Sequence, residues 1–263
     1  MCVPHRRRAG CGPGVQPWQL TFPFRRATLV GLALLAASCA GEGDIRLGRG
    51  QPGLNVARAA LSAGSPEIAL NIANSILATE PRNVAAMLSQ GDALSLLGRF
   101  NEAEASYAKA LSVDPESSDV KVGLGRLRLR SDPAQAQVLF LSVLQREPRN
   151  KVALNNLGVA HDLQGEHVSA QAAYRRALGA DPAMRAAEVN LALSMALSGK
   201  AADAVRILQP LASDPEASRR IRHDLAAALA LSGDKQAAAR VLAGDLTTEQ
   251  VEQALLAFGS LGQ

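Results

Sequence analysis

From about residue 50 onward, apolar residues recur at spacings of three and four in short segments that are separated by turn residues. Ala103, Tyr107 and Ala110 form one such stripe. This spacing places apolar side chains on one face of a helix, where they can pack against a neighbouring helix. The pattern therefore predicts an all-α protein built from short amphipathic helices.

Two residue types mark a repeat of about 34 residues in the same region. The prolines at intervals of 33 or 34 are Pro81, Pro115, Pro148, Pro182 and Pro215. The glycines at intervals of 34 or 67 are Gly64, Gly98, Gly165, Gly199 and Gly233. The double interval skips one repeat, which reads "RSDPAQ" at this point. Two series with one period indicate a repeat architecture.

Aligned on this period, "AAMLSQGDALSLLGRFNEAEASYAKALSVDP" matches "VALNNLGVAHDLQGEHVSAQAAYRRALGADP" at glycine, alanine, tyrosine, alanine and proline. The matching residues are Gly91, Ala103, Tyr107, Ala110 and Pro115 in the first segment, and Gly158, Ala170, Tyr174, Ala177 and Pro182 in the second. This pattern resembles the tetratricopeptide repeat (TPR) family, whose unit is a helical hairpin. The resemblance implies a right-handed superhelical solenoid.

The repeated residues also suggest local roles. We expect Gly91 and Gly158 to lie where the two helices of a hairpin approach most closely, opposite Ala103 and Ala170. We expect the turn glycines to end the first helix in a left-handed conformation. The three Asp-Pro pairs are predicted to be an N-cap followed by the first helical residue of the next hairpin, at Asp114-Pro115, Asp181-Pro182 and Asp214-Pro215.

The period divides the chain into six units, at residues 50–83, 84–117, 118–150, 151–184, 185–218 and a degenerate 219–246. The third unit is one residue short. Residues 247–263 are predicted to be a closing helix and tail, capped by Thr247 or Thr248, which would shield the end of the solenoid. Residues 39–49 are a short tether, and residues 1–38 are a leader for which no fold is expected.

The stretch "FRRATLVGLALLAASCAGEGD" places two arginines before an uncharged, mostly apolar run from Ala27 to Ala40. This run is shorter than the roughly 20 residues of a membrane span, and its order of features is typical of a secretory signal. "LAASC" resembles the lipobox of bacterial lipoproteins, although Ala36 stands where that family usually has a larger apolar residue. The resemblance implies lipid attachment at Cys39. Cleavage near "ASCA" without lipid, and an uncleaved anchor, remain as alternatives.

The distribution of charged residues along the chain argues against a nucleic acid as partner. The whole chain has a formal net charge of +4, but five arginines and no acidic residue precede Cys39, so the remainder carries 23 basic against 24 acidic residues. This near-neutral part has no basic stripe for a nucleic acid. Its aromatic residues are too sparse for base stacking, namely Phe100, Tyr107, Phe140, Tyr174 and Phe258. All three cysteines lie at or before Cys39, ahead of the repeats, so packing alone must hold the repeats together.

No catalytic set, metal site or cofactor site can be proposed from the sequence. His161 and His167 straddle Gly165 and are interpreted as surface residues of a repeat turn. "GLGRL" has no preceding strand and is not a phosphate loop. The sequence therefore predicts a protein that is not an enzyme and has no cofactor. An enzyme whose catalytic domain has been lost remains an alternative from another class.

What remains is a binding surface. In stacked hairpins the first helices line a concave face that usually holds a segment of a partner protein. The family pattern assigns to this groove Asp92, Arg126, Arg130, Asn155, Asn156, Val159, Asn190 and His223. We expect Asn155 and Asn156 to bind an extended backbone, and Arg126 with Arg130 to bind an acidic group. The alternative is that these polar groups only bond neighbouring repeats.

The segment "NLALSMALSGKAADAVRILQPLASDPEASRRIRHDLAAALALSGD" near the end resembles the lipoprotein of the tight-adherence (Flp-type) pilus assembly system. That resemblance implies an exported outer-membrane lipoprotein that faces the periplasm, with the pilus secretin or its assembly as protein partner and the lipid as membrane contact. The alternative is a TPR lipoprotein of other envelope biogenesis, such as polysaccharide export or outer-membrane assembly.

Overall fold

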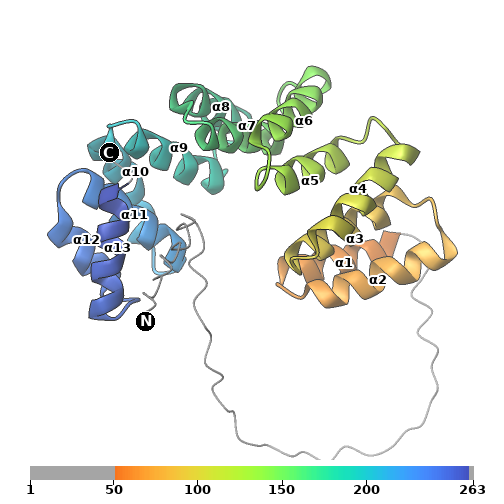
Figure 1. Cartoon of the computed structure of the whole chain (residues 1–263), viewed down its shortest axis with the longest axis horizontal. Helices are drawn as coiled ribbons and strands as arrows, with labels where there is room; N and C mark the ends of the chain where they lie inside the picture. The colour runs from red at the N-terminus through yellow and green to blue at the C-terminus, as the bar shows by residue number, and fades with distance from the viewer. Residues whose placement is uncertain (1–50, 261–263) are drawn as a thin grey trace, which may run out of the picture. The chain divides into compact units, whose positions relative to one another are not determined.

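The computed structural model describes residues 51–260, all of which are helices or the short turns between them (Figure 1). The first hairpins are α1 (Gln51–Ser62) with α2 (Pro66–Thr79), α3 (Val84–Leu96) with α4 (Phe100–Val113), and α5 (Ser118–Arg128) with α6 (Pro133–Arg146). The later hairpins are α7 (Lys151–Leu163) with α8 (His167–Ala180), α9 (Arg185–Leu197) with α10 (Ala201–Ala212), and α11 (Arg219–Leu231) with α12 (Lys235–Leu242). A last helix, α13 (Thr248–Ser260), follows. The predicted all-α fold of stacked helical hairpins is confirmed.

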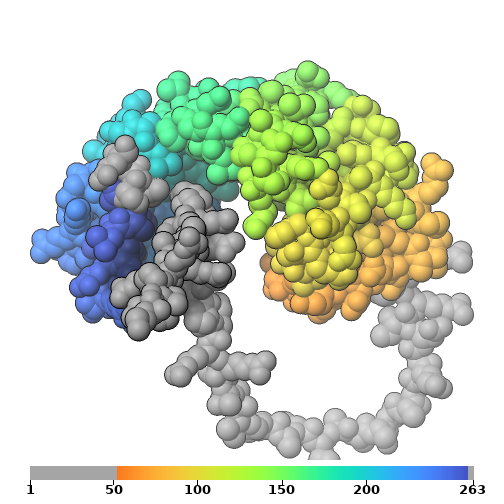
Figure 2. Space-filling model, in the orientation of Figure 1, coloured from red at the N-terminus to blue at the C-terminus, as the bar shows by residue number. Residues whose placement is uncertain are grey.

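Each hairpin packs against the next one along the chain, as Figure 2 shows from orange to blue. The first helices also contact one another, in the order α1, α3, α5, α7, α9, α11, and α11 contacts α13. Among the described residues, the second helices make no such contacts with one another. The first helices therefore line the inner face of the stack, and the second helices lie outside it.

In the second and fourth hairpins, a tyrosine ring of the second helix packs directly against a glycine of the first helix. A Cβ atom added at Gly158 would lie 2.4 Å from Cε1 of Tyr174, and one added at Gly91 would lie 2.6 Å from Cε1 of Tyr107. Both rings are almost fully buried. The expected close approach of two backbones is therefore wrong in detail, because the glycine makes room for the tyrosine ring of the second helix.

In the third hairpin, a phenylalanine ring packs against a glycine in the same way. A Cβ at Gly125 would lie 2.5 Å from Cε1 of Phe140, which is fully buried. A Cβ at Gly123 would lie 2.8 Å from Cε1 of Tyr107 in the preceding hairpin. The two glycines of "GLGRL" therefore make room for rings on either side of one helix.

The turns within the hairpins depend on left-handed glycines. Gly64, Gly98, Gly165, Gly199 and Gly233 all have positive φ, between 71° and 96°. At Gly165 the next amide, of Glu166, donates to the carbonyl of His161 at 2.9 Å, which closes the end of α7. A side chain would strain this conformation, so the predicted role of the turn glycines is confirmed.

The Asp-Pro pairs between hairpins do not begin helices. Asp114 and Asp181 are the C-caps of α4 and α8, and each accepts a hydrogen bond from the backbone amide two residues later. The next helix begins three residues beyond Pro115 and Pro182, and four residues beyond Pro215. Asp214 also accepts from the amide two residues later and begins no helix. At the start of α7, by comparison, the N-cap is an asparagine that lies after the proline: Asn150 Oδ1 accepts from the amide of Ala153 at 2.9 Å. The predicted capping role of these Asp-Pro pairs is therefore wrong.

A different Asp-Pro pair, Asp132-Pro133, does begin a helix with the aspartate as N-cap and the proline as first helical residue. Asp132 caps α6 by accepting from the amide of Gln135 at 3.0 Å, and Pro133 is the first residue of the helix. This pair replaces the turn glycine that the third repeat lacks. The predicted cap of α13 is present as well, because Thr247 Oγ1 accepts from the amide of Gln250 at 3.4 Å, while Gln250 Oε1 accepts from the Thr247 amide at 3.0 Å.

Candidate functional site

A pocket of about 490 Å³ lies on the inner face, where three successive first helices meet. Helix α7 contributes Asn155, Asn156 and Val159, helix α9 contributes Arg185, Ala186, Val189 and Asn190, and helix α11 contributes Arg220, Ile221 and Asp224. We call this cavity the groove pocket. The sequence prediction placed four of its residues in the groove, namely Asn155, Asn156, Val159 and Asn190. It missed Arg185, Arg220 and Asp224.

The asparagines of the groove pocket are largely buried but keep free hydrogen-bonding groups. Asn155 and Asn156 are 8% and 9% exposed. Asn190 Nδ2 donates to Asn155 Oδ1 at 3.0 Å, which links α9 to α7. Within the described residues, the amide nitrogen of Asn155, the amide oxygen of Asn190 and both ends of the Asn156 amide make no further hydrogen bond. The pocket thus offers donors and acceptors that match a peptide backbone.

Asp224 is the acidic residue of the groove pocket. Its Oδ2 atom is buried and has no hydrogen-bond partner among the described residues. The nearest cation is Arg220, whose Nε lies 3.9 Å from Oδ2, beyond hydrogen-bond distance. Burial raises the pKa of Asp224 to about 6, and the charge of Arg220 opposes that shift only in part. The carboxyl group therefore lacks the donors that a buried acid usually has.

Arg185 faces the same pocket but has another partner. Its Nη1 lies 3.4 Å from Asp214 Oδ2, in the turn before α11. Helix α7 contributes no charged side chain to the pocket lining. The charges of the lining are therefore those of Arg185, Arg220 and Asp224.

Asp92 and Arg126 lie on earlier first helices and bind each other. Arg126 Nη2 donates to Asp92 Oδ1 at 3.1 Å, and the Tyr107 hydroxyl donates to the same oxygen at 2.7 Å. Burial raises the pKa of Asp92, while Arg126 and the tyrosine hydrogen bond act in the opposite direction. Burial and the Asp92 charge also raise the pKa of Tyr107. Arg126 thus has an acidic partner within the chain, although half of its side chain is exposed.

Arg130 and His223 do not line the groove pocket. The guanidinium of Arg130 lies over the ring of Phe100, 4.3 Å from its centre, beside a smaller cavity of about 290 Å³. His223 is on α11, and its Nε2 lies 3.8 Å from Asp245 Oδ2 without a hydrogen bond. Burial lowers the pKa of His223. The structure therefore does not bring the predicted groove residues together as one set.

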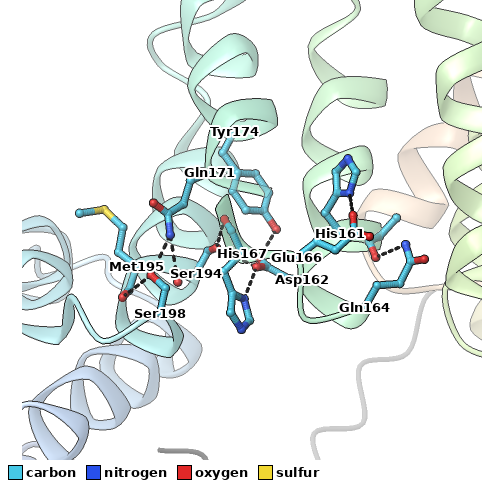
Figure 3. A network of polar contacts seen from close by, with 11 residues as sticks. His161, Asp162, Gln164, Glu166, His167, Gln171, Tyr174, Ser194, Met195 and Ser198 are labelled. Carbon is cyan, nitrogen blue, oxygen red and sulfur yellow. Dashed lines mark hydrogen bonds and ion pairs between the residues drawn. The ribbon is translucent and has the colours of Figure 1, made fainter. Parts of the chain in front are cut away.

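A network of polar contacts around Asp162 joins the fourth and fifth hairpins (Figure 3). Asp162 accepts from the Tyr174 hydroxyl at 2.9 Å and from Ser194 Oγ at 2.7 Å, and its Oδ1 lies 2.9 Å from His167 Nδ1. Gln171 adds a bond to the Ser194 carbonyl at 3.3 Å. Because Ser194 Oγ donates to the carboxylate and not to the imidazole, this set does not activate a serine nucleophile.

The two histidines of this turn are partly buried, which corrects their interpretation as surface residues. His161 is 13% exposed and its Nδ1 lies 2.6 Å from Glu166 Oε2, while His167 is 26% exposed. Each pairs with an acid five residues away across the turn. Across residues 51–260, no cluster of His, Cys, Asp and Glu could hold a metal ion, and no helix in that range is long and apolar enough to cross a membrane.

Comparison with known proteins finds similar repeats in part of the chain. The tetratricopeptide repeat family model matches residues 54–119 and 124–185. The chain is 37% identical over 106 residues to "Protein CTR9 homolog" of Arabidopsis thaliana, a match that covers 40% of this chain and 10% of that protein. It is 33% identical over 73 residues to "FK506-binding protein-like" of Mus musculus, covering 28% and 21%. The chain thus spans a tenth and about a fifth of the length of these relatives.

Solved structures agree on the fold. PilW, described as a widely conserved type IV pilus biogenesis factor, superposes with a TM-score of 0.67 at 23% identity, over 78% of this chain and 96% of PilW. A tetratricopeptide repeat protein from Parabacteroides merdae gives 0.62 at 15% identity, over 79% and 83%. At these identities the likeness shows the fold alone. That fold is a solenoid of tetratricopeptide-type hairpins.

Proposed function

We propose that this chain is a lipid-anchored scaffold of the bacterial outer membrane that faces the periplasm and holds a protein of the tight-adherence pilus machinery, the secretin being the first candidate. The observation that carries this proposal is the groove pocket, in which two successive repeats present amide groups with unused donors and acceptors and the third presents an acid. The likeness of the C-terminal repeats to the pilus lipoprotein and the fold of PilW support the pilus assignment.

The anchoring part of the proposal concerns Cys39, which lies outside the described residues. Its support is the order of basic flank, apolar run and small residues that ends at this cysteine. A single acyl chain binds a membrane only marginally, so stable anchoring requires more than one chain. In this view the lipid determines where the protein is held, and the repeats determine what it binds.

The binding part depends on how a peptide would satisfy the pocket. Asn155 and Asn156 are only 8% and 9% exposed, so the part of each residue that remains accessible in the pocket is small. A backbone N–H and C=O that lie against these groups form hydrogen bonds at little cost in desolvation. About 1.4 kcal/mol of such contact changes the dissociation constant tenfold.

The experiment is co-purification of the secretin with the full chain from detergent-solubilised envelopes. Asn155→Ala combined with Asn156→Ala should lower recovery of the secretin about tenfold or more. The matched control is Lys109→Ala combined with Arg175→Ala on the exposed faces of α4 and α8, which should leave recovery unchanged. Circular dichroism melting should be nearly the same for both variants, so that loss of binding is not loss of fold.

Two outcomes would contradict this proposal. If the asparagine variant recovers the secretin as well as the wild type does, while the control variant loses it, the outer helices form the binding surface. If Cys39→Ser remains in the membrane fraction with a lipid-modified N-terminus by mass spectrometry, the anchoring part is wrong. Recovery of a different envelope protein in place of the secretin would favour the alternative role in other envelope biogenesis.

A further inference from the structure

One polar side chain per repeat follows the inner face through the groove pocket. Asn156, Asn190 and Asp224 are each separated from the next by one repeat period, so they occupy the same position in three successive first helices. All three line the pocket. The row therefore contains two neutral amides followed by an acid.

The acid at the end of the row is not satisfied by the chain itself. Asp224 Oδ2 is buried without a hydrogen bond within residues 51–260, and the Asp224 side chain is only 17% exposed. Leaving a buried polar atom without a partner is costly, and a charged donor compensates that cost better than a neutral one. A hydrogen-bond donor brought within reach of Oδ2 by a bound segment would offset this cost.

The arginines around the pocket do not supply this donor. Arg220 is four residues from Asp224 on the same helix, is 78% exposed and approaches only to 3.9 Å. Exposed pairs of this kind contribute little. Arg185 is directed to Asp214. Neither guanidinium group therefore donates a hydrogen bond to this carboxylate oxygen.

We infer that the groove pocket is the subsite for a basic side chain of the bound protein, a lysine or arginine whose cation pairs with Asp224 while the amides of Asn155, Asn156 and Asn190 hold the backbone beside it. This inference rests on the proposed function, because it names the chemistry of the segment that the scaffold binds.

The size of the pocket and the unpaired oxygen of Asp224 fit such a side chain, because the charge of Arg185 is already balanced by Asp214 and Arg220 is largely exposed to water. A volume of about 490 Å³ lies within the usual range of ligand pockets, about 300 to 1,000 Å³, and accommodates one long side chain with its neighbouring backbone. An acidic side chain in the same place would lie beside the Asp224 carboxylate in a poorly solvated site, where like charges repel. A neutral aliphatic chain would fill the volume but leave Oδ2 unpaired.

The test uses the full chain in detergent and fluorescence anisotropy with short peptides that are end-blocked and labelled. Three pools carry lysine, norleucine or glutamate at the central position, and the other positions hold an equal mixture of alanine, serine, threonine and asparagine. The lysine pool should bind at least tenfold more tightly than the norleucine pool, and the glutamate pool should bind most weakly.

Two variants locate this preference. Asp224→Asn keeps the shape of the side chain and should make the lysine and norleucine pools bind equally. Asp119→Asn, an exposed acid on α5 that does not line the pocket, should leave the tenfold preference intact. Asn156→Ala should weaken all pools alike, because it removes contact with the backbone.

The outcomes separate this inference from the proposed function. Equal binding of the lysine and norleucine pools to the wild type, no binding of any pool, or a preference that survives in Asp224→Asn overturns the basic subsite. A glutamate preference that strengthens in Asp224→Asn would make the pocket a carboxylate site. If the secretin is still lost on changing Asn155 and Asn156, the scaffold proposal stands without this subsite.

Discussion

Gly158 in α7 is a position at which the smallest possible side chain already collides with its neighbour. A Cβ atom there would lie 2.4 Å from Cε1 and 2.7 Å from Cζ of Tyr174, whereas ordinary contacts begin near 3.4 Å. The ring is 1% exposed, and its hydroxyl donates to Asp162 at 2.9 Å. Gly158→Ala must therefore displace a buried ring and stretch or break the hydrogen bond at its far end.

The size of the effect follows from three contributions. Overpacking a core costs about 1–3 kcal/mol. Loss of a hydrogen bond to a charged group costs about 1.5–3 kcal/mol. Alanine is favoured over glycine inside a helix by about 1 kcal/mol, which opposes these losses. Central values give a net destabilisation of about 3 kcal/mol.

Urea unfolding followed by circular dichroism measures this loss, and Gly179→Ala in α8 is the matched control. A Cβ at Gly179 meets nothing within 4 Å, so only the gain in helix propensity remains and the variant should be up to about 1 kcal/mol more stable than the wild type. If Gly158→Ala and the wild type had equal free energies of unfolding, the close packing of the Tyr174 ring against Gly158 would be refuted. Because each hairpin touches only its neighbours, faster hydrogen exchange should be confined at first to residues 118–218.

Two further predictions concern acids of the last hairpin. The pKa of Asp224 lies about two units above its ordinary 3.8, so folding takes up a proton, and the free energy of unfolding falls as the pH rises from about 4 to about 6. Asp224→Asn should therefore be more stable than the wild type at pH 7 by up to about 3 kcal/mol and about equal to it near pH 3, by urea unfolding. Asp245→Ala removes a pair of bonds from Arg222, at 2.7 and 2.8 Å, and should speed hydrogen exchange across α13 at least tenfold while helices before α9 stay unchanged.

The helical hairpins could be predicted because their signals are local. A positive φ at Gly165 follows from the turn itself, and Thr247 with Gln250 forms a cap that four consecutive residues specify. The Asp-Pro pairs failed for the opposite reason. Asp114 and Asp132 both precede a proline, yet one ends a helix and the other begins one. The dipeptide does not encode this difference, which depends on which helices pack on either side.

The groove pocket could be predicted only in part. The repeat period places Asn156 and Asn190 in equivalent positions, so their shared face follows from the sequence. Asp224 was missed because the sequence prediction assigned its neighbour His223 to the groove, although the same period leads from Asn190 to Asp224. The 3.9 Å separation from Arg220 is known only from the structure. The pairing of Arg126 with Asp92 was not predicted either, because the sequence analysis expected Arg126 to bind an acidic group of a partner.

The turns between hairpins are joined along one edge of the stack by ion pairs that are largely open to water. Arg146 binds Glu116 at 2.7 Å, and Lys151 binds Asp181 at 2.6 Å. The pair of Arg185 with Asp214 continues this series across the junctions that the groove pocket spans. Salt screens such pairs, but it does not loosen rings that are buried on glycine. We therefore expect added salt to change the width of the groove pocket while every helix stays intact. The distance between spin labels placed on either side of the junction would measure this change.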